Sequence, residues 1–447
     1  MNIITLMAQL RKFKNDSELT SQRVQELSRQ RFSILLEKTY HSSEFYRDFY
    51  SAHGIKPKDL PDVAPADLPI LDKALVMENF DSLITDKSIT RRAVEDFITQ
   101  DFNPKNRFQG NAIIHTSGST GVPGIFVYSK DEWNFIVALL TARIKHPMPK
   151  AFCRFKLAFI GATIGHFAGA TLTADAPRLI YNMKQFSKPE DTEGLIRDMN
   201  EFQPDIISGY AGVIHQLALA QLDGRLKIKP KRIQSSGEAL SDQMREAVDK
   251  AFNLDVVNLY ACSESILLGI QKSSQDPFLL FNDWHHIEVV NEDNEVLPEG
   301  TPGSLLITPL YRSLQPLIRY RMSDTVALKT TDQPFITLDT FAGRETDALT
   351  FVDDEGKGHP LHPFKLVDFF APGLNKFQFE QTAPNALLAR ITVADGYSDT
   401  KQLAEEQLLD ILRKEQLEFV SSSVEVVDSI GLNPKTGKFK LILPFSE

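Results

Sequence analysis

The chain has 447 residues, 42% hydrophobic and 24% charged, values typical of a soluble globular enzyme. Its length exceeds what one compact core accommodates, so we expect one large and one small domain. The net charge of −10 argues against a surface that binds nucleic acid or an anionic membrane. Cys153 and Cys262 are the only cysteines, too few for a disulfide framework or a thiolate zinc cluster.

The first part of the chain is predicted to form a helical layer. Helical periodicity runs from about residue 18 to residue 53, and four prolines then break the chain into a turn-rich connector: Pro57, Pro61, Pro65 and Pro69. The apolar stretch Met1–Ala8 is short and lacks a cleavage site, and no apolar run approaches the length of a membrane span. We therefore expect a cytoplasmic protein without a membrane segment.

An α/β region is expected from about residue 110 to residue 330, because short apolar strands alternate there with helical segments. One helix is clear over residues 240–252, where apolar residues fall at helical spacing and Ser241 and Asp242 can cap its start. The expected strands are residues 112–114, 125–128, 156–160, 206–208, 256–260 and 304–308.

The character of the sequence changes after Gly343 and Arg344, where we expect a small α+β domain. Residues 349–352, an acidic turn and the segment from His359 onward predict a hairpin. A helix is expected over residues 403–412 and a strand over residues 424–427, before a basic, glycine-containing loop. The predicted boundary lies at residues 342–347, which gives domains 1–342 and 343–447.

The most informative segment is the glycine-rich loop from His115 to Gly124. Its position between two strands excludes a Rossmann turn, and no Gly-Lys-Ser/Thr sequence follows, which excludes a Walker loop. Backbone N–H and hydroxyl groups in such a loop can hold a polyphosphate, and an ordinary hairpin turn is the alternative. The residues that would hold phosphate are Thr116, Ser117, Gly118, Ser119, Thr120 and Gly121.

Two further motifs contain carboxylates, the first after a short apolar approach and the second at the end of a predicted strand. Residues 235–238, Ser-Ser-Gly-Glu, could contribute to a ligand site or could simply lead into a helix. Residues 260–264, Tyr-Ala-Cys-Ser-Glu, follow the strand at 256–260. There the Tyr260 ring could stack on a base and Glu264 could hold Mg²⁺ together with phosphate oxygens, unless Glu264 is an ordinary solvated side chain.

Two more motifs complete the set. Residues 316–324 close with Asp324 at a predicted strand end, where a carboxylate could accept both hydroxyls of a ribose or could cap a turn. Residues 433–438 close with Lys438 on a loop that contains glycine. A lysine there is a mobile point charge suited to a phosphate or a carboxylate, and a solvated hairpin turn is the alternative.

Histidine pairs raise the question of a metal. His285 and His286 are adjacent, and His359 and His362 are close, but neither pair has a third ligand nearby. Adjacent histidines in a strand face opposite sides. We therefore expect no zinc and assign His359 and His362 to a proline-rich loop.

The order of the five motifs resembles that of the adenylate-forming superfamily of acyl-CoA ligases, and most of all its phenylacetate-CoA ligase branch. Residues 43–47 and 68–73 resemble the entry segment of that branch, and residues 316–320 and 343–344 are its most characteristic phrases. The resemblance covers about residues 30–440. It implies an α/β fold in which a large N-terminal domain holds ATP and acid, and a small mobile α+β C-terminal domain rotates about a hinge.

The resemblance also implies a role for each motif residue. Glu264 would bind Mg²⁺, Arg344 would contact ribose or phosphate, and Lys438 would reach the α-phosphate and the substrate carboxylate. Around the base and ribose the following residues would complete the nucleotide site: Ser236, Gly237, Glu238, Tyr260, Ser263 and Asp324. Four residues would line the acid pocket, although aromatic residues in an α/β core also serve packing: Phe159, His166, Tyr210 and Ile266.

Three positions depart from the family pattern. Val122 and Gly124 stand where relatives usually supply a lysine, so a cation near the departing pyrophosphate is missing or comes from elsewhere. Thr346 occupies the hinge phrase where an acidic or basic residue is expected. Residues 358–363 replace the usual Gly-x-Asn-Val-x-Pro loop, which in relatives lies against the thiol acceptor.

The sequence thus predicts a ligase that uses ATP and Mg²⁺ to activate a carboxylic acid, aromatic by resemblance, as its acyl-adenylate. The acyl group would pass to a thiol, that of coenzyme A. Two alternatives stay open: an acid ligase that loads the phosphopantetheine of an acyl carrier protein, and an inactive nucleotide-binding scaffold. Neither nucleic acid nor a membrane is expected as a partner, and a homodimer is left open.

Overall fold

The computed structural model describes residues 8–10, 13, 19–116, 124–144, 154–187, 192–344, 349–353, 355–361, 366, 369, 371–393, 398–431 and 441–445. Contacts divide the chain into two compact units. The large unit comprises residues 1–322 and 327–339, and the small unit comprises residues 323–326 and 340–447. No helix among these described residues is long and apolar enough to cross a membrane.

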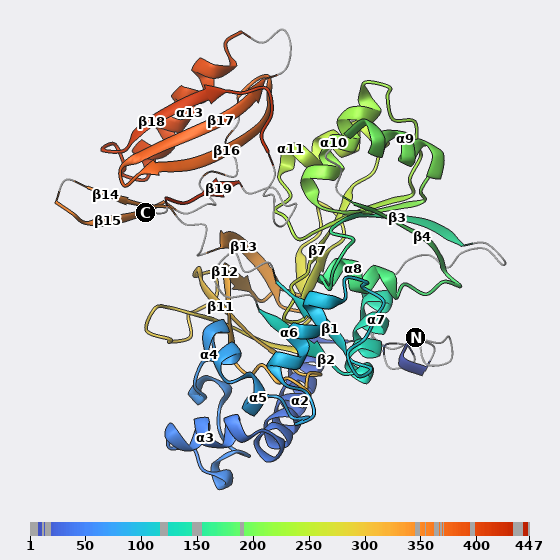
Figure 1. The fold of residues 1–447 in the computed structure, drawn as a ribbon. Helices are drawn as coiled ribbons and strands as arrows, with labels where there is room; N and C mark the ends of the chain where they lie inside the picture. Colours follow the sequence, from blue (N-terminus) through green and yellow to red (C-terminus); the bar gives the residue numbers. More distant parts are fainter. Residues whose placement is uncertain are drawn as a thin grey trace. The chain divides into compact units, whose positions relative to one another are not determined.

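The large unit begins with a helical layer, which confirms the prediction for residues 18–53 (Figure 1). Helices α2 (Ser21–Ser42) and α3 (Glu44–Ala52) meet at Ser43, whose hydroxyl accepts a hydrogen bond from the Tyr46 N–H and donates one to the Leu83 carbonyl. The layer comprises α2 (Ser21–Ser42), α3 (Glu44–Ala52), α4 (Lys73–Glu78), α5 (Phe80–Leu83), α6 (Arg91–Gln100) and the 3₁₀ turns η3 (Pro57–Asp59) and η4 (Pro65–Asp67).

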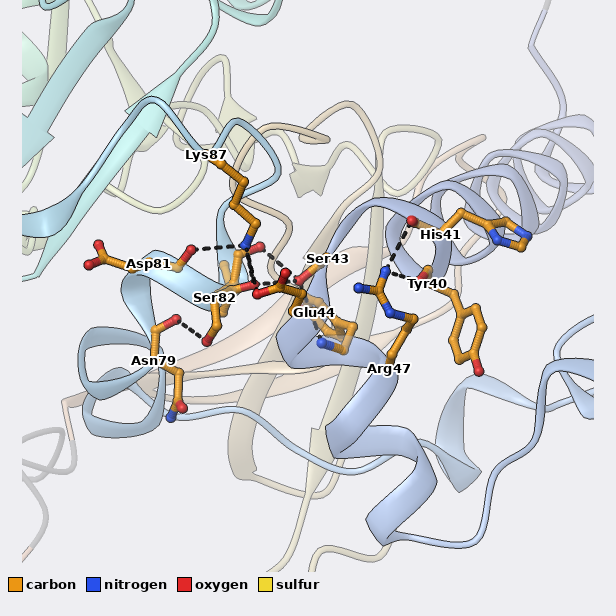
Figure 2. A network of polar contacts seen from close by, with 11 residues as sticks. Tyr40, His41, Ser43, Glu44, Arg47, Asn79, Asp81, Ser82 and Lys87 are labelled. Atoms are coloured by element: carbon orange, nitrogen blue, oxygen red, sulfur yellow. Dashed lines mark hydrogen bonds and ion pairs between the residues drawn. The ribbon is translucent and has the colours of Figure 1, made fainter.

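A polar network joins α3 to the segment after α5 (Figure 2). The Lys87 ammonium donates to the carbonyls of Asp81 and Ser82 and lies 3.5 Å from the Glu44 carboxylate. These groups are exposed, so the ion pair itself adds little stability. The Ser43 hydroxyl, which is buried, contributes the protected contact of the network.

The motif at residues 316–321 anchors this layer to the sheet. The buried Tyr46 hydroxyl donates to the Pro316 carbonyl at 2.9 Å and accepts from the Ile318 N–H at 3.1 Å. Arg319, buried and with φ of 52°, pairs with Glu288 at 3.0 Å and donates to the Ala66 carbonyl at 2.8 Å. Part of this motif therefore serves the fold.

A large sheet of eleven strands forms the centre of the large unit, in the order β10-β11-β12-β13-β9-β8-β7-β6-β5-β3-β4. Five strands pair in parallel, and this region carries the candidate site: β3 (Phe155–Gly161), β4 (Tyr181–Ser187), β5 (Ile206–Gly209), β6 (Arg232–Ser236) and β7 (Val256–Tyr260). The remaining strands are β8 (Gly269–Gln271), β9 (Phe278–Leu280), β10 (His285–Val290), β11 (Gly303–Pro309), β12 (Tyr320–Lys329) and β13 (Thr337–Arg344).

Helices cover the parallel strands (Figure 1). Helices α9 (Thr192–Phe202), α10 (Ala211–Leu222) and α11 (Asp242–Phe252) bury an apolar core against them. The Ser241 hydroxyl caps α11, as predicted, by accepting from the Met244 N–H. The alternation of side chains along β3 directs Ala158 and Ile160 into this core and leaves Phe159 for α8 (Ala168–Ala174).

The predicted strands on both sides of the glycine-rich loop form a hairpin of their own. Strand β1 (Ala112–His115) pairs antiparallel with β2 (Ile125–Tyr128), with His115 opposite Ile125. The hairpin is a separate two-stranded sheet, followed by α7 (Lys130–Ile144). The loop therefore connects two adjacent antiparallel strands.

The small unit has the α+β character that the sequence predicts. The hairpin of β14 (Leu349–Val352) and β15 (Gly358–Leu361), and helix α13 (Thr400–Lys414), are confirmed. Its main sheet has the order β18-β17-β16-β19. Sequence analysis located only β18 (Ser421–Val426), and missed β16 (Leu374–Ala383), β17 (Ala386–Val393) and the short β19 (Ile442–Leu443).

One assignment in the small unit was wrong. His359, expected in a proline-rich loop, lies in β15, where its ring is 2.7 Å from the Asp353 carboxylate and packs against Phe419. The pairing of β15 with β14 leaves this histidine in a regular strand although Pro360 follows it. His362 lies outside the described residues.

Candidate active site

Seven of the predicted site residues lie at one edge of the large sheet. Strands β3, β5, β6 and β7 are parallel neighbours, so their carboxyl ends meet there. Ligands of open α/β sheets bind in the crevice outside these ends. The last residues of these strands and the segments that follow them include Tyr210, Ser236, Gly237, Glu238, Tyr260, Ser263 and Glu264.

Glu238 joins two of these strand ends. Its carboxylate accepts a hydrogen bond from the Gly212 N–H at 2.9 Å, in the first turn of α10, where the helix dipole favours a negative charge. Gly237 has φ of 77°, a conformation that glycine adopts without strain, and so it can turn the chain directly after β6. Tyr210, which precedes α10, is hydrogen-bonded to the Ala162 backbone, and burial raises its pKa.

Phe159 fills space that two glycines leave open. A Cβ atom on Gly169 would lie 2.6 Å from its ring, and one on Gly161 would lie 2.9 Å away. The ring is buried between β3 and α8. The space beside these two glycines therefore accommodates the Phe159 ring at the carboxyl end of β3. A Cβ atom at either glycine would force this ring to move.

The base of the glycine-rich loop is closed by Thr116. Its N–H donates to the Gly124 carbonyl at 2.9 Å, and its hydroxyl accepts from the Gly124 N–H at 2.7 Å. The other proposed phosphate-binding residues lie outside the described residues: Ser117, Gly118, Ser119, Thr120 and Gly121. The departure at Val122 lies there too.

The backbone of His166 contacts the end of β1, just before this loop. Its carbonyl accepts from the His115 N–H at 3.0 Å, at the end of β1. Its ring is fully buried against Phe97 and lies 3.9 Å from the Asp101 carboxylate, and burial lowers the pKa of the imidazole. In the described structure the ring is thus packed in the core.

Glu264 lies on a tight loop after β7. Its side chain is buried, and the Tyr320 hydroxyl hydrogen-bonds to its carboxylate. Burial, and next the charge of Glu264, raises the pKa of Tyr320 well above its ordinary value. A phenol held protonated donates to the carboxylate and so orients it. Tyr260, at the end of β7, packs edge-on against Phe278.

With this geometry established, the chain can be compared with known proteins. The model of a family described as "AMP-binding enzyme" matches residues 62–309, which is more than half of the chain. This chain belongs to the AMP-binding enzyme family. It lies within the adenylate-forming superfamily, in the phenylacetate-CoA ligase-like branch, as its motifs indicated.

Curated relatives and solved structures agree with this placement of the AMP-binding enzyme. It is 26% identical to phenylacetate-coenzyme A ligase of Escherichia coli, covering 73% of this chain and 72% of that protein. It is 25% identical to Protein CapK of Staphylococcus aureus, covering 72% and 68%. A crystal structure of 2-hydroxyisobutyryl-CoA ligase shares the fold, with a TM-score of 0.72, 17% identity and coverage of 95% and 90%.

Asp324 departs from the expected position in this AMP-binding enzyme. It lies within β12, which continues to Lys329, and so it does not end a strand as predicted. Burial alternates along this strand, and Asp324 is buried on the same side as Tyr320 and Met322. The polar residues of the segment hid this regular alternation. Arg344 ends β13, its side chain outside the described residues, as is all of Lys438.

His285 is part of the support beneath the Glu264 loop. Its Nδ1 is 2.9 Å from the Phe281 carbonyl, which can only accept, so Nδ1 carries the proton and Nε2 accepts from the Ser265 hydroxyl at 2.5 Å. No group of three or more His, Cys, Asp or Glu side chains that could hold a metal occurs within the described part of the chain. His285 is therefore a buried neutral residue.

We expect acid to destabilise the protein through His285. Burial lowers its pKa to about 4, whereas the unfolded chain takes up the proton near pH 6.5. Stability is thus complete above pH 6.5 and falls as the pH drops toward 4, by up to about 3 kcal/mol from this residue. The urea concentration at the midpoint of unfolding should fall less steeply with decreasing pH in His285→Gln than in the wild type. An equal change with His53→Gln, an exposed histidine, would contradict the assignment.

Proposed function

We propose that this AMP-binding enzyme is an acid–CoA ligase that activates a small aromatic carboxylic acid. An oxygen of the acid attacks the α-phosphorus of ATP, and pyrophosphate leaves. The coenzyme A thiol then loses its proton and attacks the acyl carbon, so that a thioester forms and AMP leaves. The observation that carries the proposal is the buried, hydrogen-bonded Glu264 at the carboxyl edge that also holds Glu238 and Tyr260.

The donor set fits a Mg²⁺ ion that the protein shares with the nucleotide. Mg²⁺ typically takes one or two carboxylates together with phosphate oxygens and water. Glu264 offers one carboxylate, and the described residues contain no all-protein cage. Bound there, Mg²⁺ would neutralise charge on the phosphate oxygens. Glu264 would hold the ion, and the loop closed by Thr116 would orient the phosphates with its N–H and hydroxyl donors.

The remaining roles follow the family resemblance. Glu238 and Tyr260 border the base, Asp324 accepts the ribose hydroxyls, and Arg344 and Lys438 contact the α-phosphate side of the nucleotide. For the acid, Phe159 and Tyr210 are the proposed neighbours, since Gly161 lies between their rings. We also propose a cytoplasmic location, with which the low cysteine content agrees.

The decisive experiment is a pyrophosphate-exchange screen over aromatic and aliphatic acids. Purified protein with ATP, Mg²⁺ and the right acid should return labelled pyrophosphate to ATP. Addition of coenzyme A should then accelerate AMP release and give a thioester, because a retained acyl-adenylate limits turnover. Acceleration by a phosphopantetheinylated carrier instead would identify a carrier-loading enzyme. Intact ATP binding without exchange across the panel would support the inactive scaffold.

If exchange is robust and neither thiol accelerates AMP release, thioester formation is the wrong second step. An amine or a hydroxyl acceptor should then be tried in the same assay. This outcome would leave the adenylation half of the proposal intact.

Replacement of Asp324 by alanine should weaken the binding of both ATP and AMP about tenfold or more. Charge-assisted hydrogen bonds to the ribose are worth about 1.5 to 3 kcal/mol, and about 1.4 kcal/mol corresponds to a tenfold change. Calorimetric titration with each nucleotide measures the effect, with the exposed Asp332→Ala as control. Unchanged affinity of a folded Asp324 variant would remove this residue from the site.

A further inference from the structure

The loop that carries Glu264 has a strained backbone. The Ile266 N–H closes it by donating to the Cys262 carbonyl at 2.7 Å, and Ile266 itself has φ of 63°. A β-branched residue rarely adopts this left-handed conformation, because its side chain crowds the backbone. Such strain persists only where surrounding groups hold the segment in place.

The groups that hold it are three side chains, of which Tyr128 and Arg312 are buried and Tyr311 is half-buried. The carbonyls of the consecutive residues 263, 264 and 265 accept hydrogen bonds from the Tyr128 hydroxyl, the Arg312 guanidinium and the Tyr311 hydroxyl, at 2.7, 2.5 and 2.6 Å respectively. We call Tyr128, Tyr311 and Arg312 the carbonyl clamp. Each carbonyl of the segment is thereby fixed in direction, and with it the backbone from which the Glu264 side chain extends.

The clamp is also tied to the strand that leaves the glycine-rich loop. Arg312 donates a second hydrogen bond to the Val127 carbonyl at 3.0 Å, and its guanidinium lies 4.1 Å from the centre of the Tyr128 ring. Gln315 accepts from the Val127 N–H at 2.8 Å and donates to the Ile125 carbonyl at 3.0 Å. One set of side chains therefore contacts both β2 and the Glu264 loop.

The burial of Arg312 is costly unless the position serves a purpose. Its side chain is completely buried, and its hydrogen-bond acceptors are neutral carbonyl and amide oxygens. Within the described residues no salt bridge to a carboxylate compensates for its loss of hydration. Arg312 instead fixes geometry, because the donors of its planar guanidinium reach two backbone segments that are far apart in the sequence.

We propose that the carbonyl clamp sets the position of Glu264 relative to β2, the strand that follows the glycine-rich loop, and thereby determines how well Glu264 holds a nucleotide-bound Mg²⁺. Tyr128, Tyr311 and Arg312 are thus positioning residues, because they bond to the backbone that carries Glu264. This inference rests on the proposed adenylation activity. It predicts that loss of a contact made by any of these three residues raises the Mg²⁺ concentration that the reaction requires.

The test removes single hydroxyl groups. Tyr128→Phe and Tyr311→Phe should each raise the Mg²⁺ concentration for half-maximal pyrophosphate exchange about three- to tenfold, the equivalent of one ordinary hydrogen bond. The KM for the acid should change less. Tyr46→Phe is the matched control, because it too removes a hydroxyl that donates to a backbone carbonyl, at Pro316. It should lower the urea midpoint without changing the Mg²⁺ requirement.

A double-mutant cycle separates positioning from general weakening. In a Glu264→Gln background, Tyr311→Phe should raise the Mg²⁺ requirement no further. An unchanged requirement in both tyrosine variants, or an equal shift in Tyr46→Phe, would overturn the inference. If the wild type does not catalyse exchange at all, the proposed function fails, and Mg²⁺-dependent ATP binding by calorimetry still decides about the clamp. Equal Mg²⁺ dependence in wild type and clamp variants would then refute it.

Discussion

Replacement of Lys438 by alanine should slow acyl-adenylate formation about a thousandfold, because removal of one preorganised donor to developing charge costs about 10²- to 10³-fold and this one carries a full charge. We propose that Lys438 belongs to a mobile C-terminal domain, residues 343–447, and acts on the α-phosphate only in the first half-reaction. Transfer of the acyl group from supplied acyl-adenylate to coenzyme A should therefore continue at close to the normal rate.

The two half-reactions must be measured separately for this variant, by pyrophosphate exchange and by thioester formation from synthetic acyl-adenylate. Lys435→Ala is the matched control, because it removes a lysine from the same motif. A comparable loss in both half-reactions would argue against a lysine specific to adenylation. A comparable loss in the control would assign the effect to the loop as a whole.

Replacement of Glu264 by glutamine should lower the rate of exchange at least about tenfold at ordinary Mg²⁺, since a charge-assisted contact is worth about 1.5 to 3 kcal/mol. The amide keeps the shape of the side chain and removes the negative charge, so higher Mg²⁺ should restore part of the rate. Mg²⁺ titration of the exchange rate measures both effects.

Glu288→Gln provides the comparison, because Glu288 is a buried carboxylate on the edge strand β10, paired with Arg319. It should lower stability, since removal of one partner leaves a buried charge uncompensated, and leave the Mg²⁺ requirement unchanged. An identical Mg²⁺ response of the two variants would show that Glu264 is a structural carboxylate.

The positions of the motifs at strand ends could be predicted from the sequence because apolar strands and the turns that follow them have local signals. β7 followed by the Glu264 loop was expected, whereas the segment before Gly237 and Glu238 was recognised only as a short apolar approach and is strand β6. The fold class and the hairpin around the glycine-rich loop followed from the same patterns. Asp324 was misplaced because alternation with polar residues in β12 resembles the end of a strand.

The carbonyl clamp could not be predicted, because its contacts join residues from 46 positions apart, as between Ser265 and Tyr311, to 185 positions apart, as between Val127 and Arg312. A buried arginine has no sequence signature that separates it from an exposed one. The left-handed conformation of Ile266 runs against the preference of its residue type, and only tertiary contacts can impose it. His166 was assigned to the acid pocket by the family resemblance alone, whereas the packing of its ring on Phe97 depends on the distant helix α6.

The separate β1–β2 hairpin has an energetic consequence. The main-chain ladder of the large sheet does not include β2, and the amide of Gln315 bonds to the Ile125 carbonyl and the Val127 N–H instead. Seven of the eight residues of the two strands are buried, so opening the hairpin would expose an apolar core as well as break its own backbone pairing. Burial therefore holds these two strands in place without help from the ladder of the large sheet, and the hairpin should open only together with the core that surrounds it.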